Sequence, residues 1–341
     1  MPRLLKDVVR GVVLLVGFLL LAAMFVRLGP ARIVLLLTSL GWNFAVVVSL
    51  FGAHEFVRTL AIMRWLPAEG RPPLGELLRI RFLGEAAGAL TRTGSFAAES
   101  ARAWLLANQG GQGMQGYSAA ASELLLNSAT SAGVNVVVAG WVLLTASLEG
   151  PVMILTHVLL WGSLVYVGLA VSIAVSRVRI LRACALVAAS LPIVGRRLQM
   201  DPEKMREMEQ ASSSALTKGL STLARILLLE VSAQAILVCE VYWAIRSMGV
   251  AVSGRSALII EVMTRPLTIV EFVGATEVGF AVVFTWLGMP AAIGFTLSLV
   301  KTLRSLTAAG IGIGLLSGGD RSSSFLVRTR TPRSEVLDSG G

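Results

Sequence analysis

Long apolar stretches alternate with short polar breaks along nearly the whole chain. A helix needs about 20 mostly apolar residues to cross the hydrocarbon core of a membrane. The pattern therefore predicts an all-α integral membrane protein with about six spanning helices. The predicted spans are residues 8–26, 33–65, 118–146, 151–175, 219–247 and 290–316.

Two further regions, 74–107 and 256–288, are too polar or broken for ordinary spans and too apolar for water-exposed loops. Each is predicted to form two short helices around a small-residue turn, "TRTG" in the first and "VGAT" in the second. The segment after Glu277 holds about eleven residues, or roughly 16 Å of helix, which reaches about halfway across the hydrocarbon core. The two regions are therefore predicted as re-entrant helical hairpins, whose irregular backbone must be buried in protein or line a wet cavity.

The composition agrees with a membrane protein. Hydrophobic residues make up 55% of the 341 residues and charged residues only 15%, and the mean hydropathy is +0.76. A soluble domain carries about 25% charged residues. The net charge of +10 is typical of cytoplasmic loops that lie beside anionic lipid headgroups, so the excess does not indicate nucleic-acid binding.

The basic residues concentrate in three segments: residues 1–10, loop 176–218 and tail 318–341. The positive-inside rule places all three in the cytoplasm, and the polar tail is predicted to be disordered. With this topology, hairpin 74–107 enters the membrane from inside and hairpin 256–288 from outside.

The membrane domain, residues 1–317, would then contain two halves, 33–147 and 219–316, with the same plan and opposite orientation. Such an inverted repeat is a transporter architecture, with its binding site near the midplane.

Charged residues inside apolar segments are candidates for function, because each costs about 3 kcal/mol at the bilayer centre. Glu99 and Arg102 are spaced i and i+3 and can pair on one helix face. Glu277 opens the second half of the second hairpin and needs a partner from elsewhere. Candidate partners are Arg92, Arg265, Lys301 and Arg304. Alternatively, Glu99 and Glu277 only cap and pin the hairpins, because a carboxylate is favoured in the first turn of a helix.

Other charged residues receive structural interpretations. Glu123, Glu230 and Glu240 are predicted as interhelical or interfacial, and Arg58 is interpreted as marking the end of a span. The chain lacks a Ser-His-Asp set, paired histidines and a dinucleotide-binding fingerprint. We therefore expect neither an enzyme nor a cofactor or metal site.

Several stretches resemble the transmembrane-domain family of lysylphosphatidylglycerol synthases, also called the flippase-like domain family. They are "MRWL", "GSFAAESARAWLL", "SELLLNS" and "EVGFAVVFTWLGMPAAIGFTLSLVKTLRSL", and the resemblance covers roughly residues 8–316. Its most specific parts are Glu99 with Arg102, the Gly274-x-x-Glu277-x-Gly279 block, and Arg304. The family's prolines and extra glycines are missing from both turns, so a substrate is not carried over. A soluble aminoacyl-transferase domain, present in full synthases, is not expected.

The resemblance implies a transporter that moves a lipid with a polar, anionic headgroup across the bacterial inner membrane, with both chain termini in the cytoplasm. Arginine binds phosphate in a bidentate way, so the arginines would contact the headgroup while the glutamates orient them or relay a proton. The predicted substrate-binding residues are Arg92, Glu99, Arg102, Arg265, Glu277 and Arg304. The alternative is a non-transporting scaffold or accessory subunit of lipid or glycan synthesis. A homo-oligomer is compatible with either.

Overall fold

The structure is a computed structural model that describes residues 22–66, 71–91, 94–108, 113–145, 150–176, 220–269 and 274–317. Within these ranges all regular structure is helical, which confirms the predicted all-α class. After a short helix, Ala22–Leu28, the helices are α2 (Pro30–Leu40), α3 (Asn43–Trp65), α4 (Leu74–Thr91), α5 (Gly94–Asn108), α6 (Gly113–Thr145), α7 (Pro151–Ser176), α10 (Leu220–Ser247), α11 (Gly254–Ile269), α12 (Ala275–Trp286) and α13 (Ala291–Ser317). The basic loop, the tail and most of the first predicted span lie outside the described residues.

The chain is a multi-pass membrane protein by the length and composition of its helices. Four helices are long and apolar enough to cross a membrane, namely α3, α6, α7 and α10, and the bent pair Ala22–Leu28 with α2 could make a fifth span. The predicted span at 290–316 is not among them, and its helix α13 contains Lys301 and Arg304.

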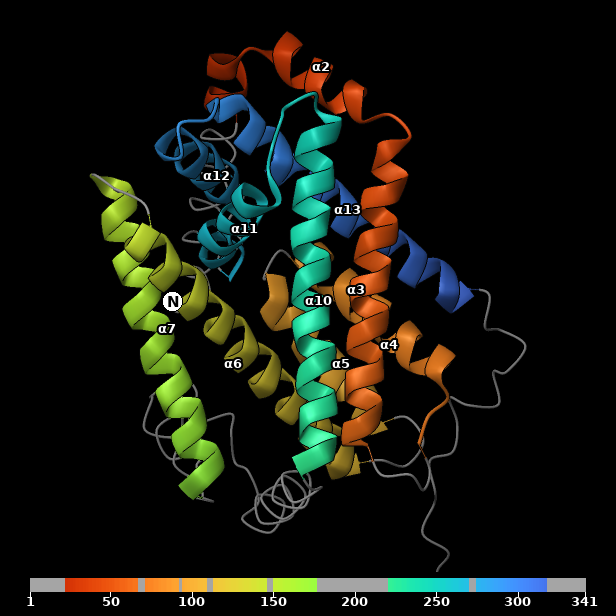
Figure 1. Cartoon of the computed structure of the whole chain (residues 1–341). Coiled ribbons are helices and arrows are strands. Elements are labelled where there is room, and N and C mark those ends of the chain that lie inside the picture. The colour runs from red at the N-terminus through yellow and green to blue at the C-terminus, as the bar shows by residue number, and fades with distance from the viewer. Residues whose placement is uncertain are drawn as a thin grey trace, which may run out of the picture.

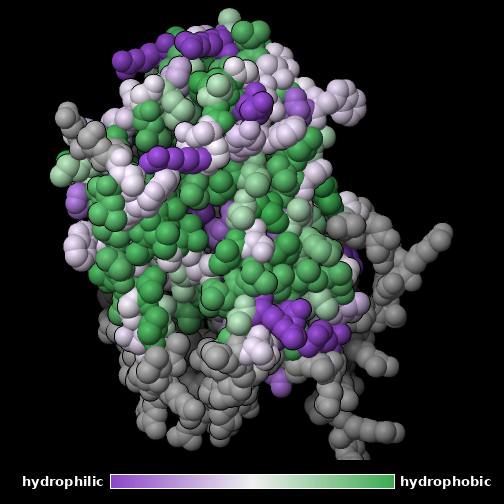
Figure 2. All heavy atoms as spheres, in the orientation of Figure 1, coloured by the Kyte–Doolittle hydropathy of each residue, from purple (hydrophilic) through white to green (hydrophobic). Residues whose placement is uncertain are grey.

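The surface of the molecule agrees with a bilayer environment. Figure 2 shows apolar side chains across the middle of one face, with hydrophilic side chains gathered toward both ends. On α7 an exposed apolar stripe follows helical spacing: Ile154, Val158, Trp161, Val165 and Leu169. A stripe of this length would be a liability in water, whereas lipid solvates it.

The prediction of one continuous helix over residues 33–65 is wrong. The chain breaks at Gly41 and Trp42, where Gly41 has a φ of 43° and ψ of −126°, a conformation that L side chains rarely adopt. In Figure 1, α2 lies across the top of the molecule, and α3 descends from it. The polar pattern gave no sign of this break, because residues 33–53 carry no charge.

Both predicted hairpin regions form helix pairs. The first pair is α4 and α5, with residues 92–93 of its turn outside the described ranges. The second is α11 and α12, for which residues 270–273 are outside. Gly274, with a φ of 82°, immediately precedes the second helix of that pair. The two-helix form of each region is confirmed, and the re-entrant geometry stays a prediction.

The helices of the two halves pack in matching ways. The helices α3 and α10 lie side by side at the centre (Figure 1), and His54 of α3 lies 3.1 Å from the carbonyl oxygen of Ala233 in α10. In the first half α5 packs on α6, and in the second half α12 packs on α13. Glycines permit both contacts: a Cβ at Gly116 would lie 2.7 Å from the backbone of Leu106, and one at Gly294 would lie 2.5 Å from the carbonyl oxygen of Phe280. This match supports the inverted repeat, which remains a prediction.

The two largest of four apolar cores among the described residues position the buried charges. One lies among α3, α4, α5, α6 and α10 and contains Trp65 and Leu106. The other lies where α10, α11, α12 and α13 meet, around Phe280 and Phe284. The buried charged residues lie between and beside these cores, so their positions depend on how both halves pack.

Candidate functional site

Seven buried or half-buried charged residues of the first half form one network, which we call the first cluster. Helix spacing of three or four residues puts the two charges of each of α3, α4 and α5 on one face. The members are Glu55 and Arg58 of α3, Arg81 and Glu85 of α4, Glu99 and Arg102 of α5, and Glu123 of α6.

Arg102 lies at the centre of the first cluster and contacts three carboxylates. Its Nη1 donates to Oε1 of Glu99 at 2.7 Å, which confirms the pairing predicted from their spacing. Its Nη2 lies 2.5 Å from Oε1 of Glu85 and 3.4 Å from Oε2 of Glu55. One guanidinium therefore ties α3, α4 and α5 together.

The other two arginines extend the network to α6. Arg58 donates to Glu123 at 2.9 Å and lies 3.4 Å from Glu99. Arg81 donates to Glu123, lies 3.3 Å from Glu55, and also donates to the backbone carbonyl of Arg58 at 3.0 Å. The interpretation of Arg58 as the end of a span is wrong, since its side chain is 7% exposed and bound to carboxylates on two other helices.

The first cluster is closed. Arg102 and Glu123 are 3% and 1% exposed, and the cavity lined by these two residues and Arg81 has a volume of about 10 Å³. That volume is about the minimum for one water molecule. Charges taken out of water are stable only when paired and hydrogen-bonded, and here each guanidinium has at least two carboxylate partners.

Gly84 makes room for Arg102, and this contact gives a testable prediction. A Cβ at Gly84 would lie 2.4 Å from Cγ of Arg102 and 2.9 Å from the carbonyl oxygen of Ala98. We expect Gly84→Ala to cost about 1–3 kcal/mol of stability through overpacking, measured as a lower midpoint of unfolding in detergent. Gly133→Ala is the control, because nothing lies within 4 Å of the added methyl group there. Equal stability of both variants would contradict the close contact.

A second, smaller group lies between α11, α13 and α6, and we call it the second cluster. Glu261 accepts a hydrogen bond from Nζ of Lys301 at 2.8 Å and lies 3.5 Å from Nη2 of Arg265. Arg265 also donates to Oγ of Ser131 at 2.6 Å and lies 3.5 Å from Oδ1 of Asn135. These contacts connect the second cluster to the middle of α6.

Arg304 of α13 pairs with Glu240 of α10. Its Nη1 lies 2.5 and 2.6 Å from the two carboxylate oxygens, and its guanidinium carbon lies 4.0 Å from the centre of the Phe51 ring. After Glu240, the carboxylates that act on Arg304 most strongly are Glu85 of the first cluster and Glu261 of the second. Arg304 therefore lies between the two clusters and links α13 to α10 and α3.

Glu277 has a capping role in the structure. It stands at the third position of α12, and its Oε2 accepts a hydrogen bond at 2.8 Å from the backbone N–H of Gly274, the residue that precedes the helix. Among its predicted cation partners, Lys301 and Arg304 bind other carboxylates. The alternative interpretation of Glu277 as a residue that caps the hairpin helix therefore has direct structural support.

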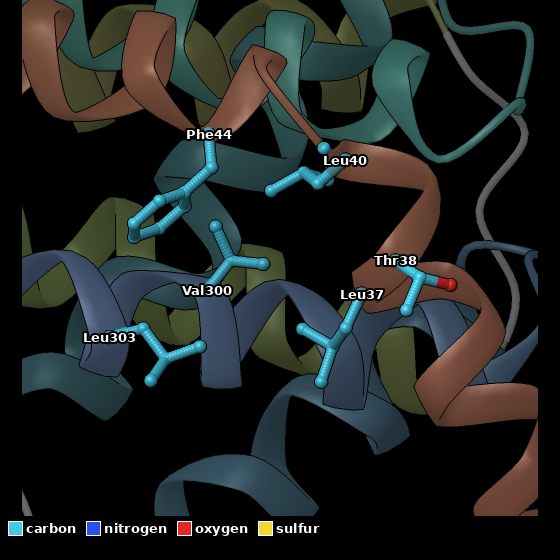
Figure 3. Close-up of a pocket in the computed structure, with 7 residues that line it drawn as sticks. Leu37, Thr38, Leu40, Phe44, Val300 and Leu303 are labelled. Carbon is cyan, nitrogen blue, oxygen red and sulfur yellow. The ribbon is translucent and has the colours of Figure 1, made fainter.

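An apolar groove opens beside Arg304. It has a volume of about 330 Å³ and is lined by Leu37, Thr38, Leu40, Gly41, Phe44, Val300 and Leu303. In Figure 3 the first of these side chains come from α2 and the start of α3, while Val300 and Leu303 come from α13. The break at Gly41 creates this groove, because it turns α2 away from the line of α3. Val300 lies one helical turn before Arg304 on the same face of α13, so the groove lies beside the ion pair.

The six predicted site residues do not all meet at one point. Glu99 and Arg102 share the first cluster, Arg265 belongs to the second, Arg304 lies between them, and Arg92 is outside the described residues. Sequence reasoning missed Glu55, Arg81 and Glu85. A signal was present, because each lies three or four residues from a charge of opposite sign on the same helix.

No family model, curated protein or solved structure matches this chain. The family resemblance seen in the sequence therefore stays a prediction.

Proposed function

We propose that this protein is a membrane transporter for a lipid with an anionic headgroup, and that it belongs to the flippase-like group its sequence resembles. The observation that carries the proposal is the placement of two clusters of buried charges inside a helical body whose outer surface is apolar. Ionisable groups at such depth are costly and typically mark pathways for polar substrates or protons. The proposed location is the bacterial inner membrane.

The arrangement of the clusters supports movement of a headgroup. Their members come from the hairpin helices α4, α5 and α11 and from the longer helices α3, α6 and α13, and the inverted-repeat prediction places the hairpins at a central site. Arg304 stands between the clusters, and its Nη1 already contacts both oxygens of the Glu240 carboxylate, while a guanidinium also binds phosphate well. A headgroup phosphate could replace Glu240 on Arg304 without leaving the arginine unpaired.

The groove beside Arg304 supports a role for the lipid tails. Its lining is apolar except for Thr38, and its volume of about 330 Å³ is at the lower end for ligand sites. A lipid whose phosphate contacts Arg304 could place part of an acyl chain between α2 and α13. In this mechanism the ion pairs of the first cluster keep the transporter closed. The transporter opens when the arginines of the cluster exchange one carboxylate partner for another.

A second candidate function, a non-transporting scaffold, is favoured by one specific observation. Arg102, Arg265 and Arg304 each bind a carboxylate, and the cavity at the first cluster has room for about one water molecule. A permanently closed network of this kind would stabilise a docking platform. The two functions differ in whether lipid crosses the membrane.

Liposomes that contain fluorescent phosphatidylglycerol and a membrane-impermeant quencher test the proposal. A transporter should let the quencher destroy the signal of both leaflets, whereas protein-free vesicles keep the inner half. We expect Arg304→Gln to slow the exchange of lipid between the two leaflets about tenfold, which corresponds to about 1.4 kcal/mol in the activation free energy. Arg246→Gln is the matched control, because Arg246 is an exposed arginine on α10 that donates to the hydroxyl of Tyr242.

Two results would count against this proposal. Wild-type protein that quenches no more than empty vesicles would favour the scaffold. Equal rates for wild type and Arg304→Gln would remove Arg304 from the path. Glu277→Gln separates capping from transport, since the amide oxygen still accepts the bond from Gly274 N–H, so a loss of exchange would assign Glu277 a role beyond the cap.

A further inference from the structure

Glu230 of α10 is a buried carboxyl group that the first cluster does not satisfy. Its side chain is 0% exposed, and neither of its carboxylate oxygens has a hydrogen-bond partner among the described residues. The charges that act on it most strongly are those of Arg58 and Glu123. An ionised carboxylate without a partner is strongly unfavourable in such a place, so this group requires something that the described side chains do not supply.

The formal charges around Glu230 point to a missing positive charge. The first cluster contains three arginines and four glutamates, and Glu230 brings the carboxylates to five. A bound proton on Glu230 would reduce this excess of negative charge. A metal ion is less suitable, because the described residues contain no group of three or more His, Cys, Asp or Glu side chains that could hold one.

The residue one helical turn away fits a protonated Glu230. Gln234 is 6% exposed, and its Oε1 has no hydrogen-bond partner among the described residues. Side chains at i and i+4 of a helix are neighbours. A proton on Glu230 creates an O–H donor one helical turn from this unused acceptor, so a single proton would neutralise Glu230 and supply a donor for Gln234.

A polar stripe along α6 leads from Glu230 toward the second cluster. Gln234 donates from Nε2 to Oδ1 of Asn127 at 3.2 Å, and Thr130, 7% exposed, has a hydroxyl oxygen without a partner in the described chain. Ser131, one helical turn after Asn127, contacts Arg265. The stripe consists of Glu123, Asn127, Thr130, Ser131 and Asn135. Four of these positions repeat every four residues, and Thr130 lies three residues after Asn127, so the stripe lies on one side of α6 and polar groups connect the two clusters through the interior.

We propose that Glu230 is the proton-binding residue of the transporter, and that the α6 stripe carries the proton between Glu230 and the second cluster. The coupling part of this proposal rests on the proposed function. When Glu230 releases its proton, the new negative charge competes with Glu99 for Arg58, whose contact with Glu99 is its longer one at 3.4 Å. Proton release thereby weakens a link between α3 and α5, and proton binding restores it.

Other charges around α10 lie beside different parts of the helix. Within the described chain, Arg81 and Glu99 act on Glu230 more weakly than Arg58 and Glu123 do. Arg304 binds Glu240, ten residues or about 15 Å of helix further along. The helices packed against α10 are α2, α3, α6, α11 and α13. Their acidic and basic residues are Arg32, His54, Glu55, Arg58, Arg64, Glu123, Arg255, Glu261, Arg265, Lys301 and Arg304.

Infrared difference spectroscopy of the full chain in lipid tests proton binding directly. We expect a C=O stretching band of a protonated carboxylic acid at neutral pH, which shifts in D₂O and disappears at alkaline pH. The Glu230→Gln variant should lose this band. Glu240→Gln is the matched control on the same helix and should keep it, because Glu240 is bound to Arg304. Size-exclusion chromatography and thermal unfolding check that both variants fold.

The outcomes separate this inference from the proposed function. A band that persists in Glu230→Gln, or one that Na⁺ removes at constant pH, would overturn proton binding at Glu230. In liposomes, a pH gradient should change the rate at which the wild-type protein moves fluorescent lipid between leaflets about tenfold, which is a usual size for coupling between two sites. The rate of the Glu230→Gln variant should not change with the gradient. Wild-type protein that moves no lipid would refute the function and the coupling, while the infrared band would still decide whether Glu230 binds the proton.

Discussion

Replacing Arg102 with alanine is expected to lower the free energy of unfolding by about 3–5 kcal/mol, because the change leaves buried carboxylates without their cation. Arg102 contacts Glu55, Glu85 and Glu99, which come from three different helices. Its loss therefore removes one contact with each of these helices in a single step, and within the first cluster only the ion pairs of Arg58 and Arg81 still join them. Unfolding of the purified protein in mixed micelles, followed by circular dichroism, measures the change.

Two variants make this result interpretable. Arg225→Ala removes an exposed arginine of α10 and should change stability by less than about 0.5 kcal/mol, as is usual at surface positions. Glu85→Gln added to Arg102→Ala removes one of the carboxylates left behind, so the double variant should be more stable than Arg102→Ala alone. If the double variant were less stable, electrostatic repulsion in the cluster would not be the source of the loss.

The sequence predicted the helices well where local pattern decides their extent. Spans such as 151–175 and 219–247 correspond closely to α7 and α10, because long and mainly apolar segments bounded by Pro, Gly or charged residues leave few alternatives. The helix pairs of both hairpins followed from the same pattern. The break at Gly41 was missed because a single glycine in an uncharged stretch gives no signal in a hydropathy profile, although its backbone conformation decides where α2 turns.

The charge clusters could be predicted only in part. The pairing of Glu99 with Arg102 is local, and helix spacing revealed it. The partners of Arg58 are 41 and 65 residues away in the chain, so its role depends on how α3, α5 and α6 pack. An arginine near the end of an apolar helix has the same local sequence pattern whether it faces water or a buried carboxylate.

The fate of Glu277 shows why the type of residue alone does not define a site. A carboxylate at the third position of a helix can accept a hydrogen bond from the backbone N–H just before the helix, and this contact depends only on the local sequence. The sequence contained both possibilities, a headgroup contact and a cap. The structure supplies the contact with Gly274 N–H, which favours the cap without testing the other role.

Exchanging the two residues of the Glu240–Arg304 pair is expected to separate stability from transport. Glu240→Arg or Arg304→Glu alone places like charges together in a buried position, and each should cost about 3–5 kcal/mol. The double variant restores opposite charges at the same place and should recover most of that loss. Thermal unfolding of the two single variants and the double variant measures this recovery.

Lipid exchange should not recover in the double variant. Swapping the two residues moves the cation from α13 to α10. The cation then no longer lies over the Phe51 ring or beside the groove lined by Val300 and Leu303. A headgroup phosphate would then meet a carboxylate where it needs a guanidinium, so we expect exchange at least about tenfold slower than wild type, or about 1.4 kcal/mol. A double variant that regains both stability and wild-type exchange would show that the pair only holds α10 to α13. Because the pair would then serve equally well with the arginine on either helix, the headgroup path would have to lie elsewhere.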